Sequence, residues 1–457
     1  MKQIESFKRI ILLLLSTVSL AFQVALFANV WLGFYADRIW KPYYYWGHFL
    51  LIGLYAILLV AFSKMYGGLR IGYMKTGDVI FSQIFATICV NLIEYVQILL
   101  LSLKVVDFKP MLKVTILDII GIILWSFISS TIYKKVFPPR DMLVIHGERP
   151  IEDILSKFAT RQDKYKICKC MNISEGVDAI CEEATKRYDA IVLWDIPTQM
   201  RNKLMKFCFG KSIRVYMMPK ISDVLVKGAA QLHLFDTPIL YIREYELSFE
   251  QRFAKRTIDI VCSFLLIIIT SPFMLITAIG VKLYDFGPVL FKQTRCTRDL
   301  KEFHILKFRS MKVDAEKDGV ARLAVKNDGR ITPIGKFIRM VRLDELPQLF
   351  NILIGEMSFI GPRPERPEIM KQYEEDMPEF VYRTKVKAGL AGYAQVYGKY
   401  NTTPYDKLKL DLFYIQNYTV WMDVKLMLLT LKIIFRPEST EGIDDSQITA
   451  LKSEEDK

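Results

Sequence analysis

The chain has 457 residues, of which 52% are hydrophobic and 24% are charged, and its formal net charge is +13. The hydrophobic share excludes an ordinary soluble protein, and the charged share excludes a chain that lies wholly within a membrane. A membrane protein with sizeable soluble domains satisfies both. Its charge suits anionic lipid or phosphate-bearing substrates and is also compatible with nucleic acid, but the apolar segments favour lipid and phosphate. The scattered cysteines and histidines lack the spacing of zinc ligands, which predicts reduced thiols in a cytoplasm-facing soluble part.

Four apolar segments open the sequence, at about residues 10–32, 46–62, 79–103 and 114–133. Each is close to the ~20 residues that cross a bilayer as a helix. Basic residues precede the first segment and follow the second and fourth, so the positive-inside rule places both ends of this bundle in the cytoplasm. The basic loop 104–113 weakens this orientation without reversing it.

Two acidic residues, Glu94 and Asp118, fall inside the third and fourth apolar segments. An ionisable side chain within a membrane is costly, which raises the question of a function. We favour a structural role for both, either through hydrogen bonds between helices or through placement at the membrane interface.

A soluble domain is predicted after Pro138-Pro139. Its expected strands are residues 142–146, 165–170, 190–194 and 213–218, and its expected helices are residues 151–158, 176–186 and 198–207. Their alternation predicts a small doubly wound parallel sheet, Rossmann-like or flavodoxin-like. The turn Gly147-Glu-Arg-Pro150 lacks the glycine pattern that approaches a pyrophosphate, which favours a regulatory or dimerising module over a nucleotide site.

A fifth apolar segment covers residues 258–281 and contains Ser271-Pro272 near its middle. Proline removes a helical hydrogen bond and kinks the chain. Basic residues flank both ends, which disfavours a simple crossing. A broken helix that enters one leaflet and returns satisfies both observations, and a proline-kinked full span is the alternative.

Cationic elements follow this segment. Strand alternation over residues 303–311 places Lys307 and Arg309 on one face, which suits a phosphate or diphosphate. Flanking prolines hold Arg363 in a stiff extended loop. Residues 387–399 carry three glycines with tyrosines between cations, which predicts a flexible ligand-contacting loop. Each of these would be ordinary surface charge if it stood alone.

Two adjacent acids, Asp344 and Glu345, follow a helix that begins at Thr332-Pro333 and is predicted to run towards Leu343. Pro347 disfavours helical geometry at the residue before it, so the pair lies at a helix break or first turn. An ionised aspartate can attack phosphorus while a neighbouring acid holds a divalent cation. A solvated pair that is salt-bridged to nearby arginines is the alternative.

Together these residues resemble the bacterial sugar transferase family, also called polyprenyl-phosphate hexose-1-phosphate transferases or monotopic phosphoglycosyl transferases. The resemblance covers about residues 253–437. The matching motifs are Lys255-Arg-Thr-Ile-Asp259, the Ser271-Pro272 break, Lys307-Phe-Arg-Ser-Met311, Arg339, Leu343-Asp-Glu-Leu-Pro-Gln-Leu-Phe-Asn351, Gly355-Glu-Met-Ser-Phe-Ile-Gly-Pro-Arg-Pro364 and Asp423-Val-Lys425. The N-terminal spans and the Rossmann-like module resemble the larger members, which initiate O-antigen, capsule or exopolysaccharide synthesis.

The resemblance implies a membrane α-helical bundle (1–137), a Rossmann-like α/β domain (141–250) and an α/β-type phosphoglycosyl transferase catalytic domain (251–437) with a re-entrant membrane helix (258–281). Residues 438–457 form an acidic tail, which is expected to be disordered. The expected location is the bacterial cytoplasmic (inner) membrane, with several spans and the catalytic domain on the cytoplasmic face. A homodimer is left open.

The chemistry implied by the resemblance is transfer of a sugar 1-phosphate from a UDP-sugar, most often UDP-glucose or UDP-galactose, to undecaprenyl phosphate with release of UMP. Asp344 is implied to be the nucleophile that forms an aspartyl-phosphosugar intermediate, and Glu345 to bind Mg²⁺. Residues implied to contact phosphate or substrate are Lys307, Arg309, Arg339, Arg363, Lys399 and Asp423, whereas Ser271 and Pro272 shape the re-entrant helix. Lys399 stands where the family often has arginine and so lacks a bidentate fork. The alternatives are a catalytically silent membrane scaffold and a glycosyltransferase that releases UDP.

Overall fold

The computed structural model of the chain describes residues 7–242, 247–313, 329–398 and 402–434. They belong to two compact units, residues 1–218 and 219–457. This division falls earlier than residue 250, because α9 (Ile221–Lys227) packs against α15 (Pro404–Gln416) and places Val224 in the core of the second unit.

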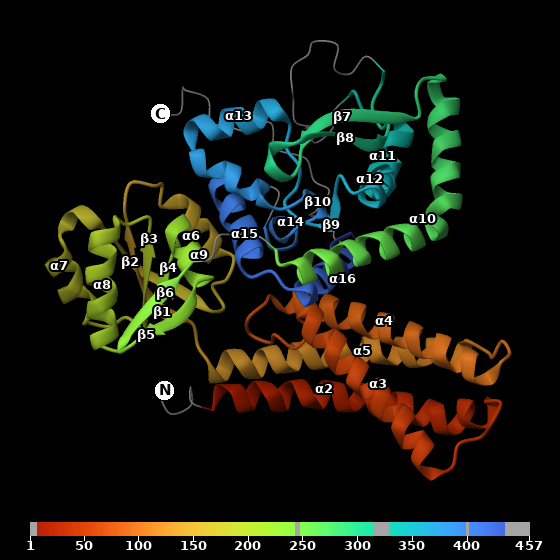
Figure 1. The fold of residues 1–457 in the computed structure, drawn as a ribbon. Helices are drawn as coiled ribbons and strands as arrows, with labels where there is room; N and C mark the ends of the chain where they lie inside the picture. Colours follow the sequence, from red (N-terminus) through yellow and green to blue (C-terminus); the bar gives the residue numbers. More distant parts are fainter. Residues whose placement is uncertain (1–6, 243–246, 314–328, 399–401, 435–457) are drawn as a thin grey trace. The chain divides into compact units, whose positions relative to one another are not determined.

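Four long helices form a bundle in the first unit, as the apolar segments predict (Figure 1). They are α2 (Lys8–Val30), α3 (Tyr45–Tyr66), α4 (Thr76–Ser102) and α5 (Lys109–Val136), with the short η1 (Trp31–Tyr35) and η2 (Ala36–Arg38) after α2. Each long helix is long and apolar enough to cross a bilayer. Leu13, Leu50 and Leu100 are 64%, 75% and 70% exposed, as expected of positions that face lipid.

The rest of the first unit is an α/β domain with a four-stranded parallel sheet. Its strands β1 (Arg140–His146), β2 (Tyr165–Asn172), β3 (Ala190–Trp194) and β4 (Arg214–Met217) are ordered β2-β1-β3-β4. Its helices are α6 (Glu152–Ala159), η3 (Ile173–Glu175), α7 (Val177–Ala184) and α8 (Thr198–Gly210). Leu143 and Ile145 pack with α7 and α8 on one face, and Met142 and Val144 pack with α6 on the other. The predicted α/β domain with a parallel sheet is therefore confirmed.

Gly147 lies just after β1, at the turn where a dinucleotide-binding domain places its ligand. A Cβ atom at this position would lie 2.1 Å from the carbonyl oxygen of Asp195. The backbone N–H of Gly147 donates to the carbonyl oxygen of Trp194 at 3.0 Å. Glycine is therefore required by the close approach of two backbone segments, which explains its presence without a phosphate ligand.

The second unit begins with α9 and the hairpin of β5 (Ala230–Leu234) and β6 (Thr237–Tyr241), and continues into α10 (Phe249–Asp285). The sequence predicts a broken helix at Ser271-Pro272. The structure instead retains one helix over 37 residues with Pro272 inside it, and Figure 1 shows that this helix is sharply bent. Bends of this kind are usually caused by proline, which removes one backbone hydrogen bond without ending the helix.

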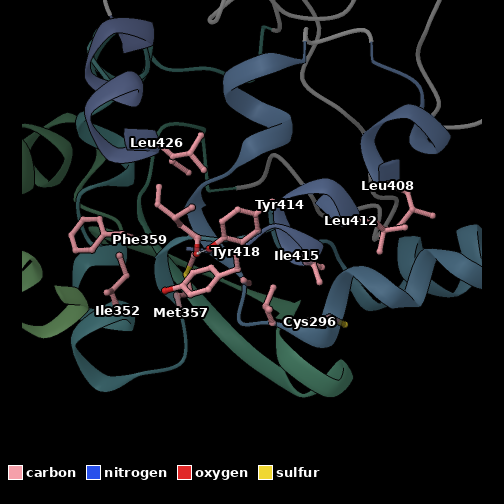
Figure 2. Close-up of a cluster of buried hydrophobic side chains, with 14 of the residues drawn as sticks. Cys296, Ile352, Met357, Phe359, Leu408, Leu412, Tyr414, Ile415, Tyr418 and Leu426 are labelled. Carbon is pink, nitrogen blue, oxygen red and sulfur yellow. Dashed lines mark hydrogen bonds between the residues drawn. The ribbon is translucent and has the colours of Figure 1, made fainter. Parts of the chain in front are cut away.

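The remaining elements of the second unit surround a large hydrophobic core and a smaller cluster of Val281, Phe308 and Ile338. The strands are β7 (Leu290–Cys296) antiparallel to β8 (Glu302–Phe308), and β9 (Ser358–Ile360) parallel to β10 (Gly389–Ala391). The helices are η4 (Arg298–Leu300), α11 (Pro333–Met340), η5 (Leu343–Glu345), α12 (Gln348–Ile354), α13 (Pro367–Asp376), η6 (Pro378–Lys385), α14 (Tyr393–Tyr397), α15 and α16 (Val420–Ile434). Figure 2 shows side chains of this core, among them Ile352, Phe359, Tyr414 and Leu426.

Residues 387–398 do not form the flexible loop that their glycines predict, because they contribute β10 and α14. A Cβ atom at Gly389 would lie 2.1 Å from the backbone nitrogen of Gly361, and one at Gly392 would lie 2.3 Å from the carbonyl oxygen of Gly361. These glycines therefore allow two backbone segments to pack tightly. The prediction of flexibility was wrong because glycine serves close approach as well as mobility.

Candidate active site

The acidic pair lies in a short turn between two helices. Thr332 caps α11, its Oγ1 accepting a hydrogen bond from the backbone N–H of Gly335 at 2.9 Å. Helix α11 ends at Met340, earlier than the predicted Leu343, because Arg342 has a left-handed backbone with φ of 60°. The 3-10 turn η5 then carries Asp344 and Glu345, and α12 follows Pro347. The predicted helix break at the acidic pair is confirmed.

Arg342 is one of the non-glycine residues with positive φ. For a residue with a Cβ atom this backbone costs roughly 1–3 kcal/mol, which the surrounding packing must offset. This backbone lies between the end of α11 and the turn that carries the acidic pair. Asp344, two residues later, lies in the interior and is only 8% exposed.

Gly335 sets how closely α11 approaches the end of β8. A Cβ atom at this position would lie 1.9 Å from the carbonyl oxygen of Ser310. Ser310 also holds Arg339, whose Nε donates to the serine Oγ at 2.9 Å. The approach of α11 and the position of Arg339 therefore depend on the same contact.

We expect Gly335→Ala to lower the free energy of unfolding of the second unit by about 1–3 kcal/mol, the usual cost of overpacking. Denaturant unfolding of the purified protein in nanodiscs measures this change. Gly329→Ala is the matched control, because no atom of the described residues, apart from its chain neighbours, lies within 4 Å of the Cβ position there. Equal stability of the two variants would contradict the prediction.

Glu345 forms ion pairs with two cations that come from distant segments. Its Oε1 accepts from Lys307 Nζ at 3.1 Å and from Arg363 Nη2 at 3.0 Å. Burial opposes the ionisation of this carboxyl, but Lys307 and Arg363 outweigh it and hold the pKa of Glu345 well below its usual range. The structure thus brings together three of the predicted site residues.

Asp344 has a different environment from its neighbour. Its Oδ1 is buried and has no hydrogen-bond partner among the described residues. Burial, and then the charge of Glu345, raise the pKa of Asp344 to about 6, although Lys307, Arg339 and Arg342 act in the opposite direction. Two adjacent acids whose pKa values move apart are suited to different roles in one reaction. Asp344 offers an oxygen that no group of the described residues engages.

Arg309 and Arg339 bind groups other than the acidic pair: Arg309 forms an ion pair with Asp285, and Arg339 donates a hydrogen bond to Ser310. Nη2 of Arg309 forms an ion pair with Asp285 at the end of α10, and its Nη1 is buried without a hydrogen-bond partner among the described residues. The guanidinium lies over Gly287, where a Cβ atom would come within 2.3 Å of Nη1. Asp285 was not predictable from the sequence, because no motif links it to Arg309.

Asp423 lies in a buried network with Lys255. Its Oδ2 accepts from Lys255 Nζ at 2.7 Å, and its Oδ1 accepts from the hydroxyl of Tyr414 at 2.7 Å. Lys255 also donates to the carbonyl oxygen of Ile360 at 2.8 Å, so the network joins α10, α15, α16 and the end of β9. Asp423 therefore connects these elements through its buried hydrogen bonds. Lys399 and the acidic tail 438–457 lie outside the described residues.

A second buried ion network is centred on Arg383 and stabilises the backbone at Arg363. Arg383 Nη2 donates to the carbonyl oxygen of Arg363 at 3.0 Å and pairs with Asp411 at 2.8 Å. Arg383 also pairs with Glu365 at 3.3 Å. Arg383 and Asp411 are 2% and 1% exposed, so these contacts are shielded from water. Sequence reasoning missed this network, which fixes the backbone that carries Arg363.

The resemblance implies Mg²⁺, and the carboxylates near the acidic pair are its possible ligands. No group of three or more His, Cys, Asp or Glu side chains suited to a metal occurs within the described ranges. Mg²⁺ is usually held by one or two carboxylates together with water and substrate phosphates. Glu345, the ligand that the resemblance implies, supplies one carboxylate beside Asp344. One carboxylate fits Mg²⁺ that is held mainly by substrate phosphates and water.

Comparison with known proteins gives consistent matches for the second unit. Residues 250–437 match the family model described as bacterial sugar transferase. The chain is 37% identical over 254 residues to the UDP-N-acetylgalactosamine-undecaprenyl-phosphate N-acetylgalactosaminephosphotransferase of Aeromonas hydrophila, covering 54% of this chain and 59% of that protein. It is 40% identical over 211 residues to the UDP-glucose:undecaprenyl-phosphate glucose-1-phosphate transferase of Escherichia coli K12, covering 45% and 44%.

A shorter relative is matched over most of its length. The chain is 39% identical over 186 residues to the exopolysaccharide production protein PSS of Rhizobium leguminosarum bv. phaseoli, covering 39% of this chain and 92% of that protein. In contrast, the match spans about half the length of the two longer relatives, at 59% and 44%.

Proposed function

Because the chain belongs to the bacterial sugar transferase family, we propose that it transfers a sugar 1-phosphate from a UDP-sugar to undecaprenyl phosphate and releases UMP. Relatives named for this type of transfer support the proposal. The observation that carries it is the buried acidic pair, in which Glu345 is neutralised by Lys307 and Arg363 while Asp344 keeps an unengaged oxygen in the described structure. The reaction would initiate exopolysaccharide or O-antigen synthesis.

The first half-reaction uses the carboxylate of Asp344. One of its oxygens attacks the phosphorus that bears the sugar, and the bond from this phosphorus to the bridging oxygen breaks. UMP leaves with that oxygen, and the phosphosugar remains on Asp344. Lys307 and Arg363 lie beside the pair and neutralise the negative charge that moves to the leaving phosphate.

The second half-reaction regenerates the carboxylate. A phosphate oxygen of undecaprenyl phosphate attacks the same phosphorus, and the bond to Asp344 breaks, which yields a lipid diphosphosugar. Glu345 would hold Mg²⁺, which neutralises diphosphate charge when bound. Two successive steps allow one site to accept a soluble donor and a lipid acceptor in turn.

We further propose that α10 enters and leaves the same membrane leaflet. A straight helix of 37 residues would be about 55 Å long. Yet Arg256 near its start donates to the carbonyl oxygens of Ile352 and Leu353, both at 2.8 Å, and Asp285 at its end pairs with Arg309. Both ends are thus tied to one compact unit, which supports a bent re-entrant helix.

In the proposed arrangement the second unit faces the cytoplasm at the bacterial inner membrane, where UDP-sugars occur. Labelling with a membrane-impermeant thiol reagent tests it. In a background without the native cysteines, single cysteines at Phe249 and Phe286, which are 73% and 72% exposed, should react from the same side of sealed vesicles. Reaction from opposite sides would contradict the re-entrant arrangement.

The proposed reaction predicts the nucleotide that is released. The full-length protein in nanodiscs that contain undecaprenyl phosphate, with Mg²⁺, should release UMP from one of UDP-glucose, UDP-galactose and UDP-N-acetylgalactosamine. Release of UDP would indicate glycosyl transfer instead. No nucleotide release with any donor, from protein that is folded and membrane-embedded, would favour a silent scaffold.

The pKa of Asp344 predicts the acid limb of the pH profile. Because this pKa is raised to about 6, the attacking carboxylate becomes protonated as the pH falls through that value. We expect kcat/KM for UMP release to decrease tenfold per pH unit below about pH 6. Activity that stayed constant down to pH 4.5 would contradict the assignment of Asp344 as the nucleophile.

A further inference from the structure

The interior of the four-helix bundle contains a continuous row of polar side chains. Gln83, Thr87, Asn91 and Glu94 recur at helical spacing on the buried face of α4, and each is at most 3% exposed. Helical spacing places these four residues on one stripe. The side chains that the other helices add to this row are Ser19, Gln23, Tyr55, Thr115 and Asp118.

Hydrogen bonds connect this row across all four helices. Thr87 on α4 donates to Oε1 of Gln23 on α2 at 2.7 Å. Tyr55 on α3 donates to Oδ1 of Asn91 at 2.9 Å. Nδ2 of Asn91 in turn lies 3.4 Å from Oδ2 of Asp118 on α5. The row therefore belongs to the interior of the assembled bundle and is not a lipid-facing stripe.

Two carboxyl groups at the end of this row lack partners. Glu94 is fully buried, and neither of its oxygens has a hydrogen-bond partner among the described residues. Oδ1 of Asp118, which is also fully buried, likewise has none in the described part of the chain. Asp118 makes the expected hydrogen bond between helices, whereas Glu94 makes none, and neither lies at an exposed interface. The structural role that the sequence favours thus accounts for Asp118 only in part.

Among the described residues, no fully buried basic side chain of the bundle neutralises these acids. The buried polar residues of the described α2 to α5 include no lysine, arginine or histidine. Helix α2 carries its charges, Lys8 and Arg9, only in its first turn. Tyr55 of α3 is the titratable group that the hydrogen-bonded row places beside the acids. Two uncompensated negative charges within a membrane would be strongly unfavourable, so positive charge must come from water.

We propose that Glu94 and Asp118 form a site inside the membrane bundle that takes up a single positive charge from water, as a proton or an alkali cation. A divalent ion is disfavoured, because it prefers more anionic ligands and no group of three suitable side chains occurs in the described chain. This site is separate from the acidic pair of the proposed transferase reaction and does not depend on it.

The polar row also supplies a route to this site. Nε2 of Gln83 donates to the carbonyl oxygen of Gly68, in the connection that follows α3, at 2.9 Å. Ser19 donates to Oε1 of the same glutamine at 3.3 Å. From Gln83 to Glu94, α4 rises about 16 Å. A row of hydroxyl and amide groups over this distance provides hydrogen-bond partners for an ion or proton that moves from the loop to the acids.

The test compares unfolding temperatures of the full-length protein in zwitterionic nanodiscs. The wild type, a Glu94→Gln/Asp118→Asn double variant and an Asp107→Asn control are each measured between pH 5 and 9, in NaCl or in choline chloride at equal ionic strength. Asp107 is an exposed acid in the connection between α4 and α5, so it controls for the loss of a negative charge. Both substitutions in the double variant preserve side-chain shape.

If a proton occupies the site, acidification should raise the unfolding temperature of the wild type and the control by roughly 2–4 °C or more in either salt. The folded state then binds protons that the unfolded state releases, so stability rises as the pH falls. If an alkali cation occupies it, NaCl should give a shift of this size over choline chloride at pH 9. The double variant should show neither response.

Equal pH and salt responses in the wild type and the double variant would overturn the proposal. Infrared spectroscopy of the single variant Glu94→Gln keeps the test decisive if the double variant does not fold. In the proton case the spectrum of the wild type contains a protonated carboxyl band that this variant loses. In the cation case a carboxylate band shifts with Na⁺ and is lost in the variant. Absence of both differences would also refute the site.

Discussion

Replacing Asp344 by asparagine is expected to lower kcat/KM for UMP release by a factor on the order of 10⁴ or more, the scale seen when a covalent nucleophile is removed. An amide has nearly the same shape as the carboxylate but cannot attack phosphorus. The fold should be unaffected, because Oδ1 of Asp344 makes no hydrogen bond with the described residues that the substitution would break. Coupled measurement of UMP with the cognate UDP-sugar checks the rate.

Two further variants test whether this loss of activity is specific to Asp344. Glu302→Gln removes an exposed acid at the start of β8 and should leave the rate unchanged. Glu345→Gln should lower activity by a different route, because it leaves Lys307 and Arg363 without their carboxylate partner. An Asp344→Asn protein that kept more than a few per cent of the rate, with an unchanged unfolding curve, would rule out attack by Asp344.

The substitution Lys255→Met is expected to lower the free energy of unfolding of the second unit by about 3–5 kcal/mol, the usual cost of removing one partner of a buried ion pair. Asp423 is 4% exposed and would lose the cation that contacts its Oδ2 at 2.7 Å. The carbonyl oxygen of Ile360 would also lose its contact with Lys255. Denaturant unfolding in nanodiscs measures the change, and Lys282→Met on the exposed end of α10 is the matched control.

A double-mutant cycle distinguishes a structural role of Asp423 from a catalytic role. Asp423→Leu alone should also destabilise the unit, whereas the combination with Lys255→Met should recover much of the loss, because no buried charge is left unpaired. If Asp423 instead contacts substrate, Asp423→Asn should lower kcat while the free energy of unfolding stays at the wild-type value. That second outcome would contradict the structural role of Asp423 in connecting the helices.

A buried network fixes the backbone of Arg363, the arginine that is proposed to contact the diphosphate of the donor. Arg383 holds the carbonyl oxygen of Arg363 at 3.0 Å while Asp411 and Glu365 hold Arg383. The guanidinium of Arg363 is therefore carried on a fixed backbone when it meets Glu345. Pre-organised charge of this kind stabilises developing negative charge without the cost of rearrangement during the reaction.

Local sequence patterns determined the elements of this protein. Apolar runs of about 20 residues predicted α2 to α5, and strand-helix alternation predicted the parallel sheet of β1 to β4. The cap at Thr332 and the break before Pro347 were likewise predictable, because a helix end depends on residues within one turn. These features require no knowledge of distant segments.

Only the tertiary structure decided which charges meet. Lys307 and Arg363 reach Glu345 from 38 and 18 residues away, and Lys255 pairs with Asp423 across 168 residues. Sequence patterns do not predict the left-handed backbone of Arg342 either. Arginine has no preference for positive φ, and the conformation is imposed by packing. Periodicity assigns a side chain to a face, but the partner on that face is selected by how separate elements pack together.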